Sequence, residues 1–380
     1  MRGIISGVEP AMRLTYVLLS PTFGMHQYTA DLANRMARAG HTVHLVTSER
    51  YPSGRYLPTV QVHTPVQTEN TGLSIRSLEW RGLRRVAEAV RATQPDLVHI
   101  TGPHVWNTPL LSRLRRWGIP TVHTLHDLEP HPGTSYGPLL HLWNRAVTRH
   151  ADHILVHGQR YRQLLIAQGV PAERVTYTPL LHLFLGCEWC AREGELTRGV
   201  SYDPYVLFFG RIEGYKGVHH LITAWAMMGG TSGHETRLVL AGPGDLGRFW
   251  AATIPPRVEV RDRLIADEEA LELFRHCSLV VFPYTGATQS ALIPAAYYFR
   301  KPVIVSPSGA LPEYVEEGRT GWVVNVQHPP SFARCLAAAL ADHERLIAMG
   351  SAGRAWYDSK RRVEEKTLLT MYERLAANGK

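Results

Sequence analysis

The sequence has few cysteines and no long apolar run, and each absence excludes a class of protein. Its 380 residues include only 4 cysteines, too few for a disulfide scaffold in a chain of this length. Apolar runs such as Val206–Phe209 and Val280–Phe282 fall far short of the roughly 18 residues that a transmembrane helix needs. The stretch Met1–Gly24 also lacks the pattern of a cleavable signal peptide. From these features we expect a cytoplasmic protein.

Long runs of like charge are missing as well. Lysines and arginines together number 41 against 33 aspartates and glutamates, which gives a net charge of +8. Such a mild positive balance favours anionic partners, among them phosphates, nucleotides and acidic lipids. Because the chain has no run of five like charges and no arginine-rich arm, we expect no nucleic-acid partner.

Short apolar runs alternate with segments of helical periodicity along most of the chain. Apolar residues make up 44% of the sequence, enough to fill the cores of two domains. Strands are predicted over 14–19, 43–46, 97–100, 121–125, 154–156, 206–209, 238–241, 258–260, 279–282 and 303–305, and helices over 25–39, 79–92, 108–117, 139–150, 160–168, 218–228, 268–276 and 291–299. Strands and helices that alternate at this spacing form right-handed βαβ units around parallel sheets.

Two doubly wound, Rossmann-like α/β domains in series account for this order. We place the first over residues 12–182 and the second over 204–353, joined by a linker over 183–203 without a regular period. A helical segment over 354–380 follows, which we expect to cross back to the first domain. Residues 1–11 precede a second plausible start and are expected to form an unstructured extension. In such folds ligands bind beyond the carboxyl ends of the strands, here in a cleft between the domains.

A glycine-rich turn after the predicted strand 206–209 is the most informative stretch. It reads Gly210-Arg211-Ile212-Glu213-Gly214-Tyr215-Lys216-Gly217. Glycine lets the backbone approach a ligand, and a guanidinium together with an ammonium group can clamp a diphosphate and neutralise it as it leaves. On these residues alone, a solvated loop whose cations face water is the alternative.

This turn and several other segments resemble the retaining glycosyltransferases of family 4, which have the GT-B fold. The segment Phe209–Val218, followed by Leu221 and Ile222, is similar to the donor-diphosphate loop of that family. Further similar segments, in the same order along the chain, are Pro21–Tyr28, Gly40–Val43, Val122–Asp127, Leu240–Gly244, Lys301–Ile304 and Gly318–Trp322. The resemblance covers nearly the whole chain from Met12 onward.

The resemblance implies an enzyme that moves a hexose-type sugar, with retention at the anomeric carbon, from a nucleoside diphosphate to a hydroxyl acceptor. The first domain then binds the acceptor and the second binds the nucleotide sugar, and glycan or glycoconjugate biosynthesis is the expected setting. Family members require no metal, and this sequence has no Asp-x-Asp metal motif. A pair of cations can replace Mg²⁺ electrostatically.

The resemblance also assigns roles to individual residues. Gly210, Arg211 and Lys216 are expected to bind the donor, and the two cations to stabilise the departing diphosphate. His126 ends an apolar strand and is expected to contact the donor sugar and to help polarise the reacting centre. Polar alternatives near it in the sequence are Asp127, Glu129 and His131.

Two more donor contacts are expected from the same comparison. Gly24 tolerates a positive φ, so that backbone N–H groups at the start of the next helix can reach phosphate. Leu264 and Ile265 follow a strand at the place where the family receives the nucleobase. We interpret Glu268 and Glu269 as first-turn charges of a helix rather than as groups that read the base.

The sequence departs from the family after the predicted strand 279–282. Typical members have two glutamates eight positions apart that touch the donor sugar and the ribose, and Ala287 and Ala295 stand in their places. The segment Ala287–Ala291 resembles a divergent branch that reads Thr-Gln-Ser-Gly. We expect the side chains there to bind sugar hydroxyls or the diphosphate, and a plain helix N-cap explains part of the pattern. These residues are Thr288, Gln289 and Ser290.

The cysteines do not indicate a metal centre. Cys187 and Cys190 form a single C-x-x-C without a second pair nearby, whereas a structural zinc ion takes four ligands. His182 is close enough in sequence to be a third ligand. We interpret the pair as reduced surface cysteines and expect neither a metal nor a cofactor.

Seven arginines in the first domain lead to an expectation about membranes. Arg81, Arg84, Arg85, Arg91, Arg113, Arg115 and Arg116 face only Glu79, Glu88 and Asp96 in the same segment. Arginines beside Trp80 and Trp117 suit a layer of anionic headgroups, so we expect peripheral association with the inner face of a membrane. Solvated helix surface is the alternative.

Neither the acceptor nor the class of function is determined by these residues alone. The acceptor is expected to dock on the loops Gly24–Tyr28, Thr101–Trp106 and Glu129–Tyr136, and a polysaccharide or lipid-linked intermediate, a secondary metabolite and a small polyol all fit. Loss of both glutamates is also compatible with a non-catalytic sugar-nucleotide-binding or scaffold subunit, and the same fold is compatible with a sugar-nucleotide epimerase or a phosphorylase. The presence of both cations and of His126 favours the active transferase.

Overall fold

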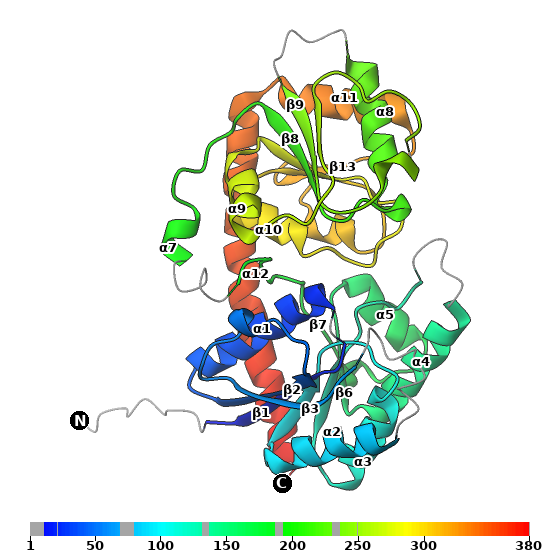
Figure 1. The fold of residues 1–380 in the computed structure, drawn as a ribbon, viewed down its shortest axis with the longest axis vertical. Coiled ribbons are helices and arrows are strands. Elements are labelled where there is room, and N and C mark those ends of the chain that lie inside the picture. The colour runs from blue at the N-terminus through cyan, green and yellow to red at the C-terminus, as the bar shows by residue number, and fades with distance from the viewer. Residues whose placement is uncertain are drawn as a thin grey trace, which may run out of the picture. The chain divides into compact units, whose positions relative to one another are not determined.

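Strands and helices alternate along the chain and form two sheets in the computed structural model of the protein (Figure 1). The structure describes residues 11–20, 22–68, 80–130, 137–186, 193–229, 236–248 and 250–379. The chain divides into two compact units. The first comprises residues 1–125, 145–154 and 368–380, and the second comprises residues 126–144 and 155–367.

The first sheet has seven strands in the order β3-β2-β1-β4-β5-β6-β7. Its strands are β1 Arg13–Leu18, β2 Thr42–Ser48, β3 Gln61–Val66, β4 Leu97–Ile100, β5 Thr121–Thr124, β6 His153–Val156 and β7 Val175–Tyr177. The central strand β1 pairs in parallel with β2 and β4, so that Leu14 lies between Val43 and Leu97. Because both faces of β1 are covered, every residue of the strand after Arg13 is buried, and all of these except Thr15 are apolar.

Helices connect these strands. They are α1 Phe23–Arg38, α2 Trp80–Ala92, α3 Asn107–Arg116, α4 Gly137–His150 and α5 Gln159–Ala167, with single 3₁₀ turns at Ser53–Arg55 and Ala172–Arg174. The helices α2, α3 and α5 each bury a stripe of side chains along one face. In α2 this stripe contains Leu83, Val86 and Val90, which recur at the spacing of one helix face.

The second sheet has six strands in the order β10-β9-β8-β11-β12-β13, and the pairs β8/β9 and β8/β11 are parallel. Its strands are β8 Tyr205–Phe209, β9 Arg237–Ala241, β10 Val258–Arg261, β11 Leu279–Phe282, β12 Val303–Val305 and β13 Gly321–Val323. The helices of this part are α7 Glu193–Leu196, α8 Val218–Met228, α9 Asp267–His276, α10 Leu292–Tyr298, α11 Pro329–Leu340 and α12 His343–Asn378, with 3₁₀ turns at Gly214–Lys216, Leu246–Arg248 and Leu311–Tyr314.

The strand order reverses once in each sheet. In the second sheet β8 lies between β9 and β11, so the connections after β8 and after β11 leave in opposite directions. Such a switch point opens a crevice at the carboxyl ends of the strands, where open α/β sheets bind ligands. The loops after β8 and β11 are therefore where a ligand of the second sheet is expected.

Two parallel sheets flanked by helices confirm the predicted fold class, but five of the described strands and α-helices were not predicted. They are β3, β7, α7, β13 and α11. The strands among them are short or lie at a sheet edge, and β3 has a single fully buried residue, so their sequences have little apolar pattern.

The last helix crosses back to the first unit, as expected, but it begins earlier than the sequence indicates. It starts at His343, and the glycines near its beginning conceal the helical pattern. Gly350 is required there because a Cβ atom would lie 1.9 Å from the carbonyl oxygen of Arg300. Residues from Leu368 onward belong to the first unit, where the Tyr372 hydroxyl lies 2.6 Å from Nδ1 of His99 on β4.

Some predictions fall on residues that the structure does not describe. These are the N-terminal extension up to Pro10, the pair Cys187 and Cys190, His131, and Glu79. Within the described ranges, no helix is long and apolar enough to cross a membrane.

Candidate functional site

The loop after β8 is held in one shape by its own backbone. The N–H of Ile212 donates to the carbonyl of Pro243 at 2.9 Å, and the N–H of Lys216 donates to that of Glu213 at 2.9 Å. Gly217 then takes a positive φ of 66° and begins α8, and a Cβ atom there would lie 1.9 Å from the Pro283 carbonyl oxygen. Only glycine fits this position, so the loop brings Lys216 close to the segment that follows β11.

The Lys216 side chain lies on an aromatic ring. Its Nζ atom is 3.7 Å from the centroid of the Tyr284 ring and 5.2 Å from that of Tyr215. Burial lowers the pKa of the Lys216 ammonium to about 7, and the positive charge of Arg211 lowers it too. The negative charges of Glu213 and Asp127 act in the opposite direction. Lys216 is therefore a cation that loses its proton unless an anion stabilises it.

Arg211 is the exposed member of the pair of cations. Its Nη1 atom lies 2.9 Å from Oε1 of Glu213, and its side chain is 66% exposed. An ion pair so exposed contributes little to stability. Arg211 can therefore turn from Glu213 to an incoming anion at small cost, as a ligand clamp requires. The preceding residue, Gly210, donates its N–H to the carbonyl of Ala241 at 2.9 Å.

The loop after β11 contains the three polar residues that the sequence singled out. Thr288 is buried and donates its hydroxyl to Oδ1 of Asp127 at 2.9 Å. The Oε1 atom of Gln289 is buried and has no hydrogen-bond partner in the part of the chain that the structure describes. Ser290 accepts a hydrogen bond from the N–H of Leu292 at 3.4 Å, so it partly serves the start of α10. The helix begins at Leu292, which places Thr288 before the helix and not at its first residues.

The two alanines that replace the glutamates of the family differ in their surroundings. Ala287 is 9% exposed and Ala295 is completely buried within α10. The N–H of Ala287 donates to the Ser308 hydroxyl at 3.0 Å, which fixes this end of the loop. Neither position offers a charged group to a ligand.

His126 follows β5 and is almost completely buried. Its ring lies 5.2 Å from that of His157, at an angle of 40° between the planes. Nδ1 of His157 lies 2.9 Å from the carbonyl oxygen of Thr178 and therefore carries the proton and donates it. His126 therefore has a fixed aromatic neighbour, His157, close to the carboxyl end of strand β5.

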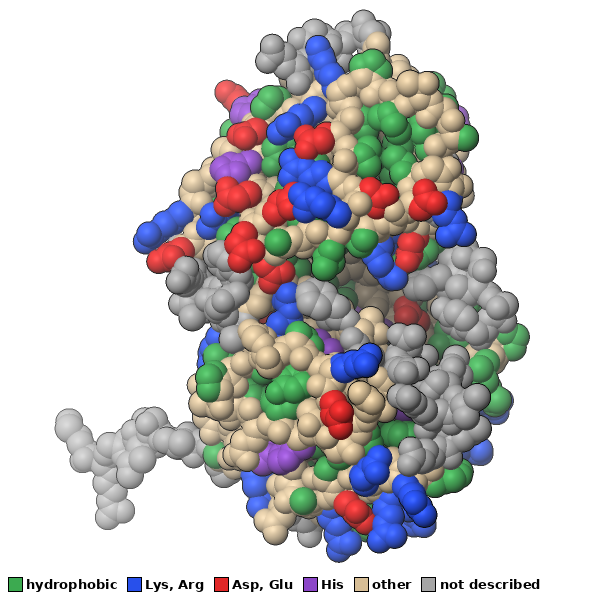
Figure 2. All heavy atoms as spheres, viewed as in Figure 1, with side chains coloured by type: hydrophobic (Ala, Val, Ile, Leu, Met, Phe, Trp, Pro, Cys, Tyr) green, Lys and Arg blue, Asp and Glu red, His purple; other side chains and the backbone are tan. Residues whose placement is uncertain are grey.

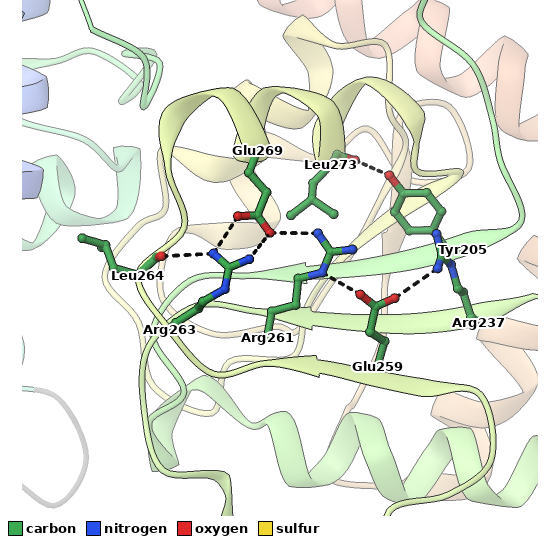
Figure 3. A network of polar contacts seen from close by, with 8 residues as sticks. All are labelled: Tyr205, Arg237, Glu259, Arg261, Arg263, Leu264, Glu269 and Leu273. Carbon is green, nitrogen blue, oxygen red and sulfur yellow. Dashed lines mark hydrogen bonds and ion pairs between the residues drawn. The ribbon is translucent and has the colours of Figure 1, made fainter.

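A network of ion pairs shapes the connection from β10 to α9 (Figure 3). Glu269 in the first turn of α9 accepts hydrogen bonds from Arg263 at 2.7 Å and from Arg261 at 2.9 Å, and the bond from Arg263 lowers the pKa of the Glu269 carboxyl. The interpretation of Glu269 as a first-turn charge is confirmed. Between these groups Leu264 is 78% exposed, whereas Ile265 is only 8% exposed. Of the two predicted nucleobase contacts, Leu264 has a side chain that a ligand can reach.

Gly24 does not use the freedom that the sequence suggested. It lies in the first turn of α1 and is absent from the glycines with positive φ. A Cβ atom there would have no neighbour within 4 Å. Gly24 therefore has an ordinary helical backbone, because α1 begins at Phe23, two residues before the predicted start at residue 25. Its contact with the donor phosphates stays a prediction.

Interactions within the second unit connect several of the predicted residues. Lys216 contacts Tyr284 and is within electrostatic reach of Asp127, which in turn binds Thr288. Tyr284 was missed by the sequence analysis. The rule that ligands meet residues directly after strands could have found it, because only Pro283 separates it from β11. No group of three His, Cys, Asp or Glu side chains suited to a metal ion occurs among the residues that the structure describes.

Comparison with known families agrees with this arrangement. A family model described as "Glycosyl transferase 4-like domain" matches residues 23–180, and one described as "Glycosyl transferases group 1" matches residues 203–342. The two sheets and the matched segments define a glycosyltransferase with the GT-B fold. The chain belongs to the family 4 glycosyltransferases.

The individual proteins that the chain resembles have low sequence identity to it. The chain is 27% identical to a D-inositol 3-phosphate glycosyltransferase of Gordonia bronchialis, covering 87% of this chain and 79% of that protein. Among solved structures it is similar to a sucrose-phosphate synthase of Thermosynechococcus elongatus, with a TM-score of 0.72, 18% identity, and coverage of 96% of this chain and 99% of the other. The Anabaena protein HepE in complex with UDP and glucose has a TM-score of 0.70 at 17% identity and covers 95% of this chain and 99% of its own. At 17% and 18% identity, these two solved structures show that the fold is shared and nothing more.

Proposed function

We propose that the protein transfers a sugar from a nucleoside diphosphate to a hydroxyl acceptor, with retention at the anomeric carbon and without a metal ion. The observation that carries this proposal is the loop after β8, the strand at which the order of the second sheet reverses. This loop contains two cationic side chains. One of them, Lys216, lies on the Tyr284 ring and has a lowered pKa, and the other, Arg211, is exposed.

Each part of this loop suits a departing diphosphate. As the sugar–phosphate bond breaks, negative charge collects on the diphosphate oxygens, and a guanidinium and an ammonium group stabilise that charge more strongly than they stabilise the bound donor. The diphosphate also raises the pKa of Lys216, so that the lysine is charged when it is needed. Gln289 has a buried acceptor without a partner in the described chain, which can take a hydrogen bond from a sugar hydroxyl. His126 then positions the sugar.

A panel of UDP-, GDP- and ADP-sugars tests the proposal. A true donor raises the melting temperature with its concentration, because it binds only the folded state. UDP-glucose is tested first, since HepE has been solved with UDP and with UDP-glucose. Analysis of the product by NMR then decides the anomeric configuration, and an assay in the presence of a chelator decides the need for metal.

The other classes of function give different results in the same assays. A binding or scaffold subunit is stabilised by a sugar nucleotide but neither hydrolyses nor transfers it. An epimerase converts the sugar without an acceptor. Donor consumption that requires an acceptor and yields a glycoside supports the proposal. Donor consumption that needs no acceptor, or that yields no glycoside, contradicts it.

We infer that the acceptor belongs to glycan or glycoconjugate biosynthesis. Several relatives are named D-inositol 3-phosphate glycosyltransferases, so D-inositol 3-phosphate is included among the acceptors to be tested. Lipid-linked sugars and small polyols complete the panel.

We further propose that the first unit associates with anionic membranes through α2 and α3. Lys and Arg side chains gather over these two helices at the lower end of the view (Figure 2). Trp80 at the start of α2 is 75% exposed, and Arg91 lies 5.1 Å from the ring of Trp117, which follows α3. Exposed arginines and an exposed tryptophan together suit the headgroup layer. The exposed arginines are Arg81, Arg84, Arg85, Arg91, Arg115 and Arg116.

A further inference from the structure

A chain of buried hydrogen bonds runs through the first unit. Nδ1 of His99 on β4 lies 2.6 Å from the Tyr372 hydroxyl of α12, and its Nε2 lies 2.8 Å from Oγ1 of Thr124, the last residue of β5. The Thr124 hydroxyl in turn lies 3.1 Å from that of Tyr28 on α1. At the other end, the Tyr16 hydroxyl of β1 lies 3.4 Å from that of Tyr372. Five elements of the first unit therefore meet in one series of contacts, which we call the His99 chain.

The His99 chain is closed to solvent. Tyr28, its most exposed member, is only 3% exposed. Burial raises the pKa of the Tyr372 hydroxyl well above its usual value, so this group keeps its proton. A neutral imidazole donates through one nitrogen and accepts through the other, so the two hydroxyls beside His99 occupy both of its nitrogens. Because a buried polar atom that loses its partner is costly, each member of the chain holds the next in place.

The His99 chain ends where the strand order of the first sheet reverses. β1 lies between β2 and β4, so the connections after β1 and after β4 leave in opposite directions, and a ligand of this sheet is expected at those two connections. Tyr28 lies in the second turn of α1, the helix that follows β1. The next residue, Thr29, places its Oγ1 atom 2.7 Å from that of Thr101, which directly follows β4. The chain therefore acts on a helix start that borders the expected ligand site.

Apolar packing already holds the end of α12 in the first unit. Leu368, Met371 and Ala376 on this helix are buried, and so is the ring of Tyr372. A phenylalanine at position 372 would fill almost the same volume. The hydroxyl is therefore not needed to dock the helix, and its contribution lies in what it holds through His99.

We propose that Tyr372 is a positioning residue for the acceptor: acting through His99 and Thr124, its hydroxyl fixes the start of α1 at the switch point of the first sheet. The inference rests on the proposed function, in which a hydroxyl acceptor receives the sugar, and it assigns that acceptor to the loops after β1 and β4. The nucleotide sugar is held by loops of the second sheet. Loss of the Tyr372 hydroxyl is therefore expected to weaken the acceptor and to spare the donor.

The direct test measures hydrogen exchange in the full-length protein without any ligand. Mass spectrometry follows the peptide that contains residues 26–33 of α1. In Tyr372→Phe, which keeps the ring, we expect this peptide to exchange about threefold or more faster than in the wild type. Tyr357→Phe is the matched control, because it removes another buried hydroxyl of α12, which donates to the carbonyl of Leu181 at 3.2 Å in the second unit. Equal exchange of the α1 peptide in the wild type and Tyr372→Phe overturns the proposal.

Substitutions at Thr124 show whether the effect passes along the His99 chain. Thr124→Val removes the hydroxyl that joins His99 to Tyr28, and Thr124→Ser keeps it. We expect the valine variant to speed exchange in α1 and the serine variant to resemble the wild type. In the Thr124→Val protein, Tyr372→Phe should have little further effect on α1, because the path is already broken. An effect of Tyr372→Phe that is undiminished in that protein contradicts a path through Thr124.

Kinetics separate failure of this inference from failure of the proposed function. With UDP-glucose as donor, the probe acceptor is D-inositol 3-phosphate or, if the wild type does not use it, the member of the acceptor panel that it does use. We expect Tyr372→Phe to raise the KM for this acceptor about threefold or more, with the Kd of UDP-glucose within about twofold of the wild type. A purely structural loss lowers the amount of active protein and leaves the acceptor KM unchanged.

Two outcomes of the kinetic experiment have different meanings. If the wild type transfers sugar to no acceptor of the panel, the proposed function is wrong, and hydrogen exchange still decides whether Tyr372 positions α1. If the wild type transfers sugar and Tyr372→Phe has the same acceptor KM, the inference is wrong and the proposed function stands.

Discussion

The Nζ atom of Lys216 lies 3.7 Å from the centroid of the Tyr284 ring, so the ammonium group of one loop rests on an aromatic face of another. Tyr284 is completely buried, and burial raises the pKa of its hydroxyl, which therefore stays neutral. The electron-rich face attracts the cation and offsets part of the free energy that burial costs it.

This contact predicts different effects for two substitutions of Tyr284. Tyr284→Phe keeps the ring, so we expect kcat/KM to stay within about threefold of the wild type. Tyr284→Leu removes the face beneath Lys216, and we expect a loss of about tenfold or more in kcat/KM. Thermal unfolding of both variants shows whether the leucine acts through stability. Equal losses in the two variants would contradict a role for the ring.

The two cations of the β8 loop are expected to be essential for turnover. Arg211→Ala and Lys216→Ala each remove a charge-assisted contact to the leaving diphosphate, at a cost of roughly 3–4 kcal/mol, or two or more orders of magnitude in kcat. Arg248→Ala, which removes an exposed arginine elsewhere in the second unit, is the control and should be near normal. Near-normal turnover in both loop variants would rule out the clamp.

Lys301 predicts a pH dependence of stability. Its side chain is completely buried, donates a hydrogen bond to the carbonyl of Ser201, and lies 4.1 Å from the centroid of the Tyr202 ring. Burial lowers its pKa to about 8, whereas an unfolded lysine has a pKa of about 10.4. Between these values the unfolded chain binds more protons, so the free energy of unfolding rises with pH through this group.

Comparison with Lys301→Met isolates that contribution. Denaturant unfolding is measured at about pH 7 and about pH 9.5 for both proteins. The stability of the wild type relative to Lys301→Met should increase at the higher pH, since the variant has no group to titrate. Parallel pH profiles would mean that Lys301 titrates normally in the folded state.

Substitution by alanine is expected to lower the stability of the protein at one glycine and to leave it unchanged at another. Gly217→Ala forces a positive φ on alanine and places its Cβ atom 1.9 Å from the Pro283 carbonyl oxygen, so we expect a loss of stability of at least about 2 kcal/mol. Gly24→Ala meets nothing within 4 Å and lies in a helix, so the protein should remain as stable as the wild type. If Gly24→Ala also leaves donor affinity unchanged, the first loop does not need glycine to approach the phosphates.

The arginines of α2 and α3 are tested with liposomes. Co-sedimentation should appear with anionic lipid, weaken with added salt, and fall when Arg84, Arg85, Arg115 and Arg116 are changed to glutamine, because each cation near the surface contributes about 1 kcal/mol. Arg84 forms an ion pair with Glu88 at 2.7 Å, so its share is the smallest. Four exposed arginines of the second unit, changed together, give a control of equal charge: Arg198, Arg248, Arg319 and Arg334. A protein that stays in the supernatant at low salt contradicts the proposal.

The alternation of strands and helices could be predicted because parallel strands are buried on both faces. Strands such as β8 and β11 appear in the sequence as short continuous apolar runs, and glycines mark the ends of several helices. Edge strands lack this signal. β3 has a single buried residue, and β13 begins with glycine, so only their pairing partners define them as strands.

The sequence by itself determined the α/β architecture and the two cations on a glycine-rich turn after a buried strand, because both depend on residues that are neighbours in the chain. The tertiary structure alone decided what Lys216 faces. Tyr284 beneath Lys216 and Asp127 against Thr288 come from segments far apart in the sequence, and no local pattern relates them. Tyr284 reaches Lys216 because β8 and β11 are neighbours in the second sheet, so that the loops at their carboxyl ends lie at one edge. Asp127 follows β5, a strand of the other sheet, so its hydrogen bond with Thr288 depends on packing beyond a single sheet.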